Sequence, residues 1–294
     1  MKNTQDDFYP GALTIAGSDS GGGSGIQADL RTFNAAGVYG CSVITAVTAQ
    51  NPRQITAVAA MEEALVKAQL ESVFSAIKVK AVKTGMLANE KIVKTVAETL
   101  KKYKLPLIVD PVMFSNGKTA LLDEAGCEAM KKLLLPLANL ITPNIPEAEY
   151  LANRKLKNEK DYAEAAMFLA ETYNCNVLLN TNYTAGANKS CDVVVLDKKL
   201  YVLTSPRIAD MEEYADHGAG CTRSSGITAM IAAGNSWGDA IVAAQAHVSG
   251  ALSETANIGK GLEAMYPPLE DYSRQVTLRS MEKNGRKNGG NNAR

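Results

Sequence analysis

The chain has 294 residues, of which 46% are apolar and 21% charged, a composition typical of a globular protein with a large buried core. Its 31 Lys and Arg residues balance 31 Asp and Glu residues, so the formal net charge is zero. Proteins that grip nucleic acid usually carry a net basic face, and the balanced charge argues against a nucleic-acid partner.

The first predicted strand and helix are Ala12–Ala16 and Ile26–Ala36, and short apolar runs alternate with helix-length stretches from there onward. The later predicted strands are Ser42–Thr48, Ile55–Ala60, Ala81–Met86, Leu107–Asp110, Asn139–Thr142, Asn176–Asn180 and a late hairpin of residues 193–195 and 200–203. The later predicted helices are Glu62–Ile77, Glu90–Lys102, Gly220–Ala233 and Trp237–Thr255. This alternation predicts an α/β fold with a mostly parallel central sheet between helices.

Neither an internal repeat nor a linker divides the chain, so we expect a single domain over residues 1–282. Residues 283–294 are polar and rich in Gly and Asn, which is typical of a disordered tail. Five scattered cysteines without a Cys-x-x-Cys pair favour free thiols in a reducing compartment. The sequence shows no secretory signal and no run of roughly 18 apolar residues that would cross a membrane. We therefore expect a cytoplasmic protein with no membrane partner.

A glycine-rich loop follows the first predicted strand. Five of the nine residues in Gly17–Gly25 are glycines, which lets the backbone approach a ligand closely. The loop is not a dinucleotide fingerprint, because Ile26 stands where the last glycine would be. In the next helix, Asp29 lies beside the apolar stripe, where its carboxylate needs either an arginine or a ligand donor as partner. Gln50 ends the second strand and could read a ring nitrogen or amine, whereas we interpret Asn51, before a proline, as a turn residue.

A second segment of small residues, Asp216–Thr222, leads into a predicted helix. Successive backbone N–H groups can converge at such a helix start, where the helix dipole also favours an anion. This arrangement suits the charge that develops on a transferring phosphoryl group. The same position is expected to lower the pKa of the Cys221 thiol.

Two carboxylates, Asp110 and Glu147, follow predicted strands. Ligands of open α/β sheets lie beyond the carboxyl ends of the strands, and carboxylates there suit Mg²⁺ bound together with substrate phosphates. The chain has only His217 and His247, thirty residues apart, so a histidine-rich zinc site is not expected. We expect His247 to serve packing.

These motifs together resemble the hydroxymethylpyrimidine and phosphomethylpyrimidine kinases of thiamine synthesis, within the ribokinase-like superfamily. The resemblance rests on ALTIAGSDSGGGSGIQADL (12–30), YGCSVITAVTAQN (39–51), VKTGML (82–87), VDPVM (109–113), LITPNIPEA (140–148), HGAGCT (217–222) and GKG (259–261). It implies a three-layer α/β/α sandwich, often a homodimer, that uses ATP and Mg²⁺ to phosphorylate a small pyrimidine.

The resemblance also implies roles for the matching residues. The implied substrate-binding residues are Gly17, Asp29, Gln50 and Met86. The implied catalytic residues are Gly218, Ala219, Gly220 and Cys221, with Cys221 as general base unless the proton leaves through phosphate oxygens. The implied nucleotide-binding residues are Asn144, Glu147, Asn180 and Lys260, and the implied Mg²⁺ ligands are Asp110 and Glu147.

One departure from the family pattern bears on ATP. The family usually has Lys-Gly-Gly-His where this chain reads Asn180-Thr181-Asn182-Tyr183, and an amide does not replace a lysine charge on phosphate. Lys189 is a candidate replacement, and the loop 207–216 is unusually acidic. Arg223 would compensate if it turned inward, although we favour a solvated position for it. Besides the pyrimidine kinase, two hypotheses therefore remain, a pyridoxal-type vitamin B6 kinase and a pyrimidine-binding protein with a degraded ATP site.

Overall fold

The computed structural model describes residues 9–115, 119–184, 188–208 and 214–281. Its main sheet has ten strands, namely β1 (Gly11–Asp19), β2 (Tyr39–Asn51), β3 (Gln54–Ala60), β4 (Val79–Thr84), β5 (Leu107–Val109), β8 (Leu140–Ile141), β9 (Asn176–Thr184), β10 (Lys189–Leu196), β11 (Lys199–Pro206) and β14 (Thr277–Ser280). Their order across the sheet is β14-β11-β10-β9-β8-β5-β4-β1-β2-β3. The strands from β9 to β2 pair in parallel, and antiparallel strands extend both edges.

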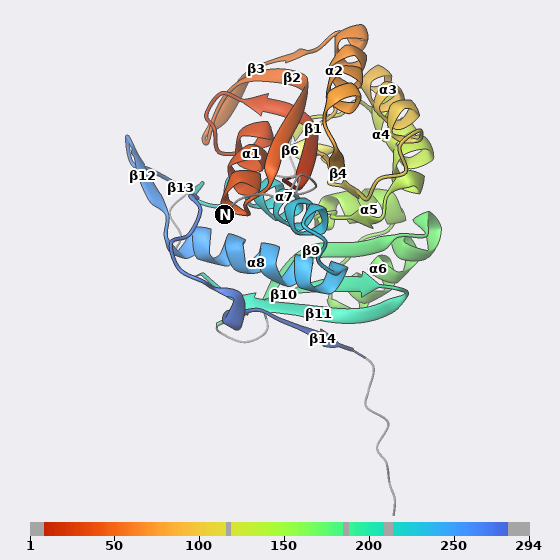
Figure 1. The fold of residues 1–294 in the computed structure, drawn as a ribbon. Helices are drawn as coiled ribbons and strands as arrows, with labels where there is room; N and C mark the ends of the chain where they lie inside the picture. The colour runs from red at the N-terminus through yellow and green to blue at the C-terminus, as the bar shows by residue number, and fades with distance from the viewer. Residues whose placement is uncertain (1–8, 116–118, 185–187, 209–213, 282–294) are drawn as a thin grey trace, which may run out of the picture.

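Helices cover both faces of this sheet (Figure 1). One face carries α1 (Gly25–Ala35), α7 (Ala219–Ala232) and α8 (Trp237–Ser253). The other carries α2 (Glu63–Ala76), α3 (Glu90–Leu100), α4 (Glu124–Ala129), α5 (Ile145–Ala152) and α6 (Glu159–Tyr173). Short helical turns (Met130–Leu134, Leu135–Leu137 and Ser273–Gln275) and two small hairpins, β6 (Phe114–Ser115) with β7 (Thr119–Ala120) and β12 (Ala256–Gly259) with β13 (Leu262–Ala264), complete the described structure.

The apolar core divides according to the pleat of the strands. Successive side chains of a strand point to opposite faces. Val109 therefore packs with the α2–α6 layer, whereas its neighbour Ile108 packs with α7 and α8. Likewise, Leu13 joins the first layer while Ala12 contacts the cluster of α1 and α7. The predicted α/β fold and its three-layer arrangement are confirmed.

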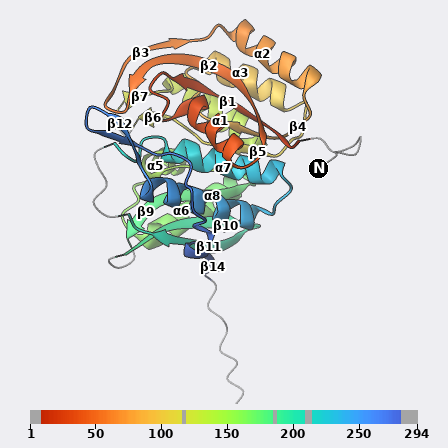
Figure 2. The ribbon, with the colours of Figure 1, turned by 60° about the vertical axis from the view of Figure 1, so that its left-hand side comes forward.

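Because six strands run in parallel, their carboxyl ends lie at the same edge of the sheet. Figure 2 shows the fold from a second direction. One sheet takes strands from residue 11 to residue 280, and the single domain over 1–282 stays a prediction. The predicted disordered tail, 283–294, lies outside the described residues. Within the described ranges, every helix is too short or too polar to cross a bilayer.

Candidate active site

A cavity of about 300 Å³ opens at the carboxyl ends of the parallel strands. This is the position where open α/β sheets bind ligands, and the volume is at the lower end of the range for small-molecule sites. The glycine-rich loop and the start of α7 both border it. The predicted site residues that line it are Gly17, Gln50, Met86, Asp110, Asn144, Glu147, Gly218, Gly220 and Cys221.

Asp19 organises the glycine-rich loop. Its Oδ1 accepts the Gly21 N–H at 2.8 Å, and its Oδ2 accepts the Ser24 N–H at 2.9 Å and the Ser24 hydroxyl at 3.0 Å. Burial alone would raise the pKa of Asp19, but a hydrogen bond from His217 and those from Ser24 and Gly21 lower it to about 2. The carboxylate is therefore ionised at neutral pH and holds the loop in one shape.

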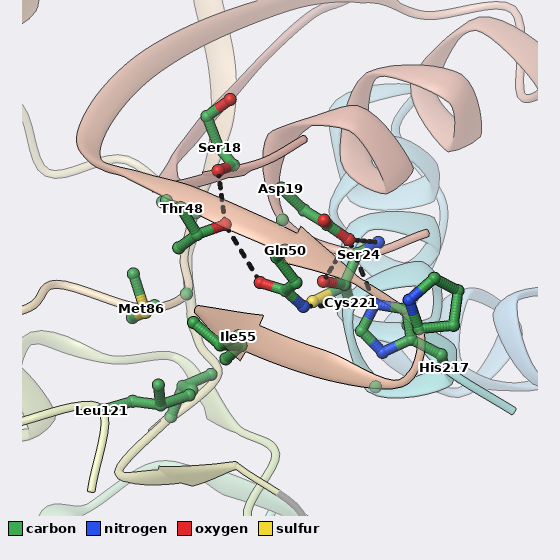
Figure 3. Close-up of a pocket in the computed structure, with 18 of the residues that line it drawn as sticks. Ser18, Asp19, Ser24, Thr48, Gln50, Ile55, Met86, Leu121, His217 and Cys221 are labelled. Carbon is green, nitrogen blue, oxygen red and sulfur yellow. Dashed lines mark hydrogen bonds and ion pairs between the residues drawn. The ribbon is translucent and has the colours of Figure 1, made fainter. Parts of the chain in front are cut away.

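His217 joins this loop to the segment before α7. Its Nε2 lies 3.1 Å from Asp19 Oδ2 and 3.3 Å from Gln50 Nε2. Figure 3 shows these three side chains pointing toward one another at the edge of the cavity. The Gln50 Oε1 accepts a hydrogen bond from the Thr48 hydroxyl at 3.0 Å.

The opposite wall of the same end is apolar. Met86, Ile55 and Leu121 line the cavity away from the polar group (Figure 3). A Cβ atom at Gly17 would lie 2.6 Å from the Met86 methyl carbon, so the loop can approach this wall because residue 17 has no side chain. A flat ring bound between Gln50 and Met86 could form hydrogen bonds with the Gln50 amide through its polar edge and pack its face against the Met86 thioether.

Asp29 does not lie at this cavity, contrary to expectation. Its side chain is fully buried, and Oδ1 forms an ion pair with Lys83 Nζ at 2.6 Å. The Thr14 hydroxyl donates to Oδ2 at 2.6 Å. Both carboxylate oxygens therefore have protein partners behind the site, and a lysine takes the place of the arginine or ligand donor that the helix pattern suggested.

The start of α7 lies against the glycine-rich loop in backbone contact. Gly218 has a φ of +90°, and a Cβ atom there would lie 1.9 Å from the Gly23 carbonyl oxygen. Ala219 requires a correction, because its N–H already donates to the Asp216 carbonyl at 3.0 Å and the residue does not line the cavity. The amides of Gly220 and Cys221 have no hydrogen-bond partner among the described residues, so they are available to an anion.

The predicted lowering of the Cys221 pKa is wrong for this structure. Burial raises the pKa of the thiol to about 12, although the ammonium of Lys83 opposes the shift. The helix start does not overcome desolvation at this depth. Cys221 is therefore a neutral thiol at pH 7 in the unliganded protein, which favours the alternative that the substrate proton leaves through phosphate oxygens.

Asp110 and Glu147 form an acidic pair at the other end of the cavity. Burial raises the pKa of Glu147 to about 8, and the charge of Asp110 adds to the shift. Burial also raises the pKa of Asp110, against the opposing charges of Lys83 and Arg223 and a 3.1 Å hydrogen bond from the Ser224 hydroxyl. Two buried acids that resist ionisation are suited to a divalent cation, which would favour their charged forms.

The start of α5 fixes Glu147 in place. The Asn144 side chain accepts the Glu147 N–H at 2.9 Å, and Glu147 Oε2 accepts the Asn144 N–H at 3.0 Å. This capping box explains the Asn-x-x-Glu spacing locally. Glu147 Oε1 also accepts the Met113 N–H at 3.3 Å. No group of three or more metal-binding side chains occurs in the part of the chain that the structure describes, so substrate phosphates and water would complete a Mg²⁺ shell.

Other predicted nucleotide residues lie farther out. Asn180 forms a backbone bridge with Asn144 but does not line the cavity. Lys260 lies on the β12–β13 turn, where its carbonyl accepts a hydrogen bond from Arg53 at 2.8 Å. Lys189 begins β10 and is exposed. The roles of Asn180 and Lys260 toward a nucleotide stay predictions.

Arg223 is not solvated, contrary to the position we favoured. Its side chain is buried, and Nη1 lies 2.6 Å from Asp192 Oδ2. Asn51 behaves as the predicted turn residue, because its Oδ1 accepts the backbone N–H groups of Arg53 and Gln54. Of the acidic loop 207–216, residues 209–213 lie outside the described residues.

Sequence reasoning missed two residues of the site, Asp19 and His217, and the buried Lys83 behind it. Asp19 has one signal, since an aspartate within a glycine-rich loop can accept nearby backbone N–H groups. His217 and Lys83 act through contacts with residues far away in the chain, and no local pattern predicts these.

Sequence comparison places the chain among kinases. The family model for phosphomethylpyrimidine kinase matches residues 19–266. The chain is 42% identical over 253 residues to the hydroxymethylpyrimidine/phosphomethylpyrimidine kinase of Rhizobium meliloti, covering 85% of this chain and 94% of that protein. It is 40% identical over 250 residues to a thiamine biosynthesis bifunctional protein of Geobacter sulfurreducens, covering 85% of this chain but 50% of that longer protein.

Solved structures give the same fold. A pyridoxal kinase from Staphylococcus aureus in complex with AMP-PCP superposes with a TM-score of 0.82 at 30% identity, covering 93% of this chain and 100% of that one. A phosphomethylpyrimidine kinase from Clostridium difficile superposes with a TM-score of 0.71 at 39% identity, covering 81% and 97%. These likenesses confirm the ribokinase-like fold that the motifs implied. Given the match over residues 19–266 and the identity to full-length relatives, the chain belongs to the phosphomethylpyrimidine kinase family.

Proposed function

We propose that this protein transfers the γ-phosphoryl group of ATP to the hydroxymethyl group of 4-amino-5-hydroxymethyl-2-methylpyrimidine, and a second one to the monophosphate, in thiamine biosynthesis. One observation carries the proposal. The glycine-rich loop and the start of α7 border a single cavity, which Gln50 and Met86 line together with the Asp110–Glu147 pair. In-line transfer needs an acceptor and a donor at opposite ends of one site.

The pyrimidine end supplies shape and hydrogen bonds. The Gln50 side chain lies between the Thr48 hydroxyl, which donates to its Oε1, and the His217 ring, and lines the cavity where a ring nitrogen or amine would bind. Met86 offers a polarizable face for the ring. Because the Asp19 carboxylate fixes the loop and His217 together, this end is formed before the substrate arrives.

The phosphate end supplies charge stabilisation. The N–H groups of Gly220 and Cys221 would donate hydrogen bonds to the transferring phosphoryl group and stabilise the negative charge that develops on it. Asp110 and Glu147 would hold Mg²⁺, which would supply positive charge to neutralise the phosphates. The Cys221 thiol, neutral at pH 7, would orient the attacking hydroxyl rather than remove its proton.

We also propose a cytoplasmic homodimer. All five cysteines are free, as a reducing compartment would keep them. β3 is the last strand of the sheet, and the side chains of Gln54–Ala60 are mostly exposed, with Val58 at 50%. An exposed edge of this kind is a template for pairing with a second copy. Light scattering on wild type and Val58→Lys would test this, with a monomeric wild type contradicting it.

The test of function is product analysis by mass spectrometry. The protein is incubated with ATP, Mg²⁺ and either hydroxymethylpyrimidine or pyridoxal, and products with one or two added phosphoryl groups are quantified. We expect the pyrimidine to be converted, with the KM for pyrimidine raised at least tenfold in Gln50→Ala and the KM for ATP little changed. Faster conversion of pyridoxal would instead favour a vitamin B6 kinase. Unchanged substrates at high enzyme concentration would favour a binding protein.

A further inference from the structure

The strand that should carry the family's lysine is irregular at that position. In the β9–β10 ladder, Leu179 pairs with Val193 and Tyr183 pairs with Cys191. Residues 180–182 of β9 therefore face Asp192 alone on β10, which makes a bulge on β9. Bulges re-aim the backbone and are common beside active sites. This one holds Asn180, whose backbone N–H donates to the Pro143 carbonyl and which bridges to the cavity residue Asn144.

The side chain of Asp192 supplies a hydrogen-bond acceptor that the interrupted ladder does not provide. Its Oδ1 accepts the Thr181 N–H at 2.8 Å inside the bulge. Its Oδ2 accepts from Arg223 Nη1 at 2.6 Å. A single carboxylate thus ties the bulge to α7, two residues after Cys221. The side chains of Arg223 and Asp192 are only 8% and 6% exposed, so the pair is little screened by solvent.

The scarcity of basic side chains at the cavity makes the Arg223–Asp192 pair relevant to nucleotide binding. Among the described residues that line the cavity, Arg53 is the sole lysine or arginine, and it lies on the β2–β3 turn. No second lysine or arginine among these described lining residues accompanies Asp110 and Glu147. The Arg223 guanidinium shares a carboxylate with the Thr181 amide, so it lies next to the position where the family's lysine would begin.

We propose that Arg223 is a positioning residue for the nucleotide. Through Asp192 it holds the first turn of α7 against the bulge of β9, so that the Gly220 and Cys221 amides face the same phosphate groups as Asn144, the cavity residue that Asn180 bridges. This inference rests on the proposed ATP-dependent function. The pyrimidine end should be insensitive to it, because β9 lies four strands from β1, about 19 Å at about 4.8 Å per strand.

The test compares variants by calorimetric binding of AMP-PCP with Mg²⁺, and by separate KM values for ATP and hydroxymethylpyrimidine. Arg223→Leu alone would leave the buried Asp192 charge unpaired and risk unfolding. The central variant is therefore Arg223→Leu with Asp192→Asn, and Arg223→Lys tests whether charge without the guanidinium fork suffices. Asp192→Asn alone retains an acceptor for Thr181 but leaves the buried Arg223 charge without its carboxylate, so its melting temperature is measured beside its binding.

We expect the double variant to bind AMP-PCP at least tenfold more weakly and to raise the KM for ATP similarly, with the KM for pyrimidine within twofold of wild type. Arg223→Lys should recover part of the loss. A double variant that melts at a lower temperature but binds AMP-PCP like wild type would overturn the proposal and leave a purely structural ion pair. Wild type that binds AMP-PCP without turning over substrate would contradict the kinase function, while the binding series would still decide the role of Arg223.

Discussion

The buried Lys83–Asp29 ion pair gives the sharpest test of how this site is supported. Both side chains are fully buried, and their charged atoms lie 2.6 Å apart. Removing one partner of such a pair costs about 3–5 kcal/mol, because the other charge is left without compensation. We expect Asp29→Asn to lower the free energy of unfolding by about that amount. With about 2.1 cal/mol/K of unfolding entropy per residue, this corresponds to a drop in melting temperature of about 5–8 °C.

The assay is urea denaturation followed by circular dichroism, with Glu90→Gln as matched control. Glu90 pairs with Lys94 at 2.7 Å, almost the same distance, but the two side chains are 40% and 49% exposed. An exposed helix pair contributes about 0.3–0.5 kcal/mol, so the control should unfold close to wild type. The double variant Asp29→Leu/Lys83→Met should recover most of the loss, since it removes both members of the pair.

The pH dependence follows from the direction of the Lys83 shift. Burial would lower the pKa of Lys83, but the Asp29 carboxylate raises it above the ordinary lysine value. Stability from a raised lysine pKa is fully present below the unfolded pKa and is lost only as pH rises through the folded one. The contribution of Lys83 to wild-type stability should therefore stay constant up to about pH 9, while burial, which raises the pKa of Asp29 as well, can change only the Asp29 contribution in that range. In Asp29→Asn, a loss below about 1 kcal/mol, like that of a surface pair, would refute the reasoning.

Three further predictions address the cavity. Gly218→Ala should lower kcat by about 10²–10³-fold in an initial-rate assay, because its Cβ would meet the Gly23 carbonyl and displace the anion-binding amides. Gly234→Ala is the control, since Gly234 has a similar φ of +92° but open space around the Cβ, and it should keep the wild-type kcat. Without Mg²⁺, the wild-type free energy of unfolding should fall from pH 5 to pH 8, because Glu147 ionises near pH 4.5 in the unfolded state and near pH 8 in the folded state. Urea denaturation of Glu147→Gln should show a weaker dependence on pH. An equal dependence in both proteins would show that burial does not raise the pKa of Glu147. Cys221 should react slowly with iodoacetamide at pH 7.5 and faster as pH rises, because its pKa is about 12; rapid labelling at neutral pH, read by peptide mass spectrometry, would show a thiolate instead.

Most of the fold was predictable from local pattern. Alternating apolar runs and amphipathic stretches located β1, β2, β4 and the two closing helices to within a few residues, because burial on both faces requires those patterns. The sequence analysis did not predict β14 and the β12–β13 hairpin. These are short and mostly exposed, and β14 depends on pairing with β11, so no apolar periodicity marks them.

Residues of the site were predictable where backbone chemistry alone determines the role. Gly218 and the Asn144–Glu147 capping box follow from turn and cap preferences, which are local. Asp29 and Arg223 were misplaced for the same physical reason as each other. Each is a charged residue near a buried helix face whose partner, Lys83 or Asp192, comes from a distant strand. A helix pattern says that such a charge needs a partner, but tertiary packing decides which one.

The site depends on contact between segments about 200 positions apart in the chain. Gly23 meets Gly218 through backbone alone, and Asp19 binds His217 just before it, so the loop that borders the pyrimidine end also fixes the approach to α7. Hydrogen bonds from His217 and the loop amides lower the pKa of Asp19 to about 2, although burial opposes the shift. The Asp19–His217 contact therefore stabilises the folded state above the ordinary aspartate pKa, and this stabilisation is lost as pH falls toward 2. Under the proposed function, this contact would aim an acceptor hydroxyl at the amides of α7, with the spacing between loop and helix set by the fold rather than by the substrate.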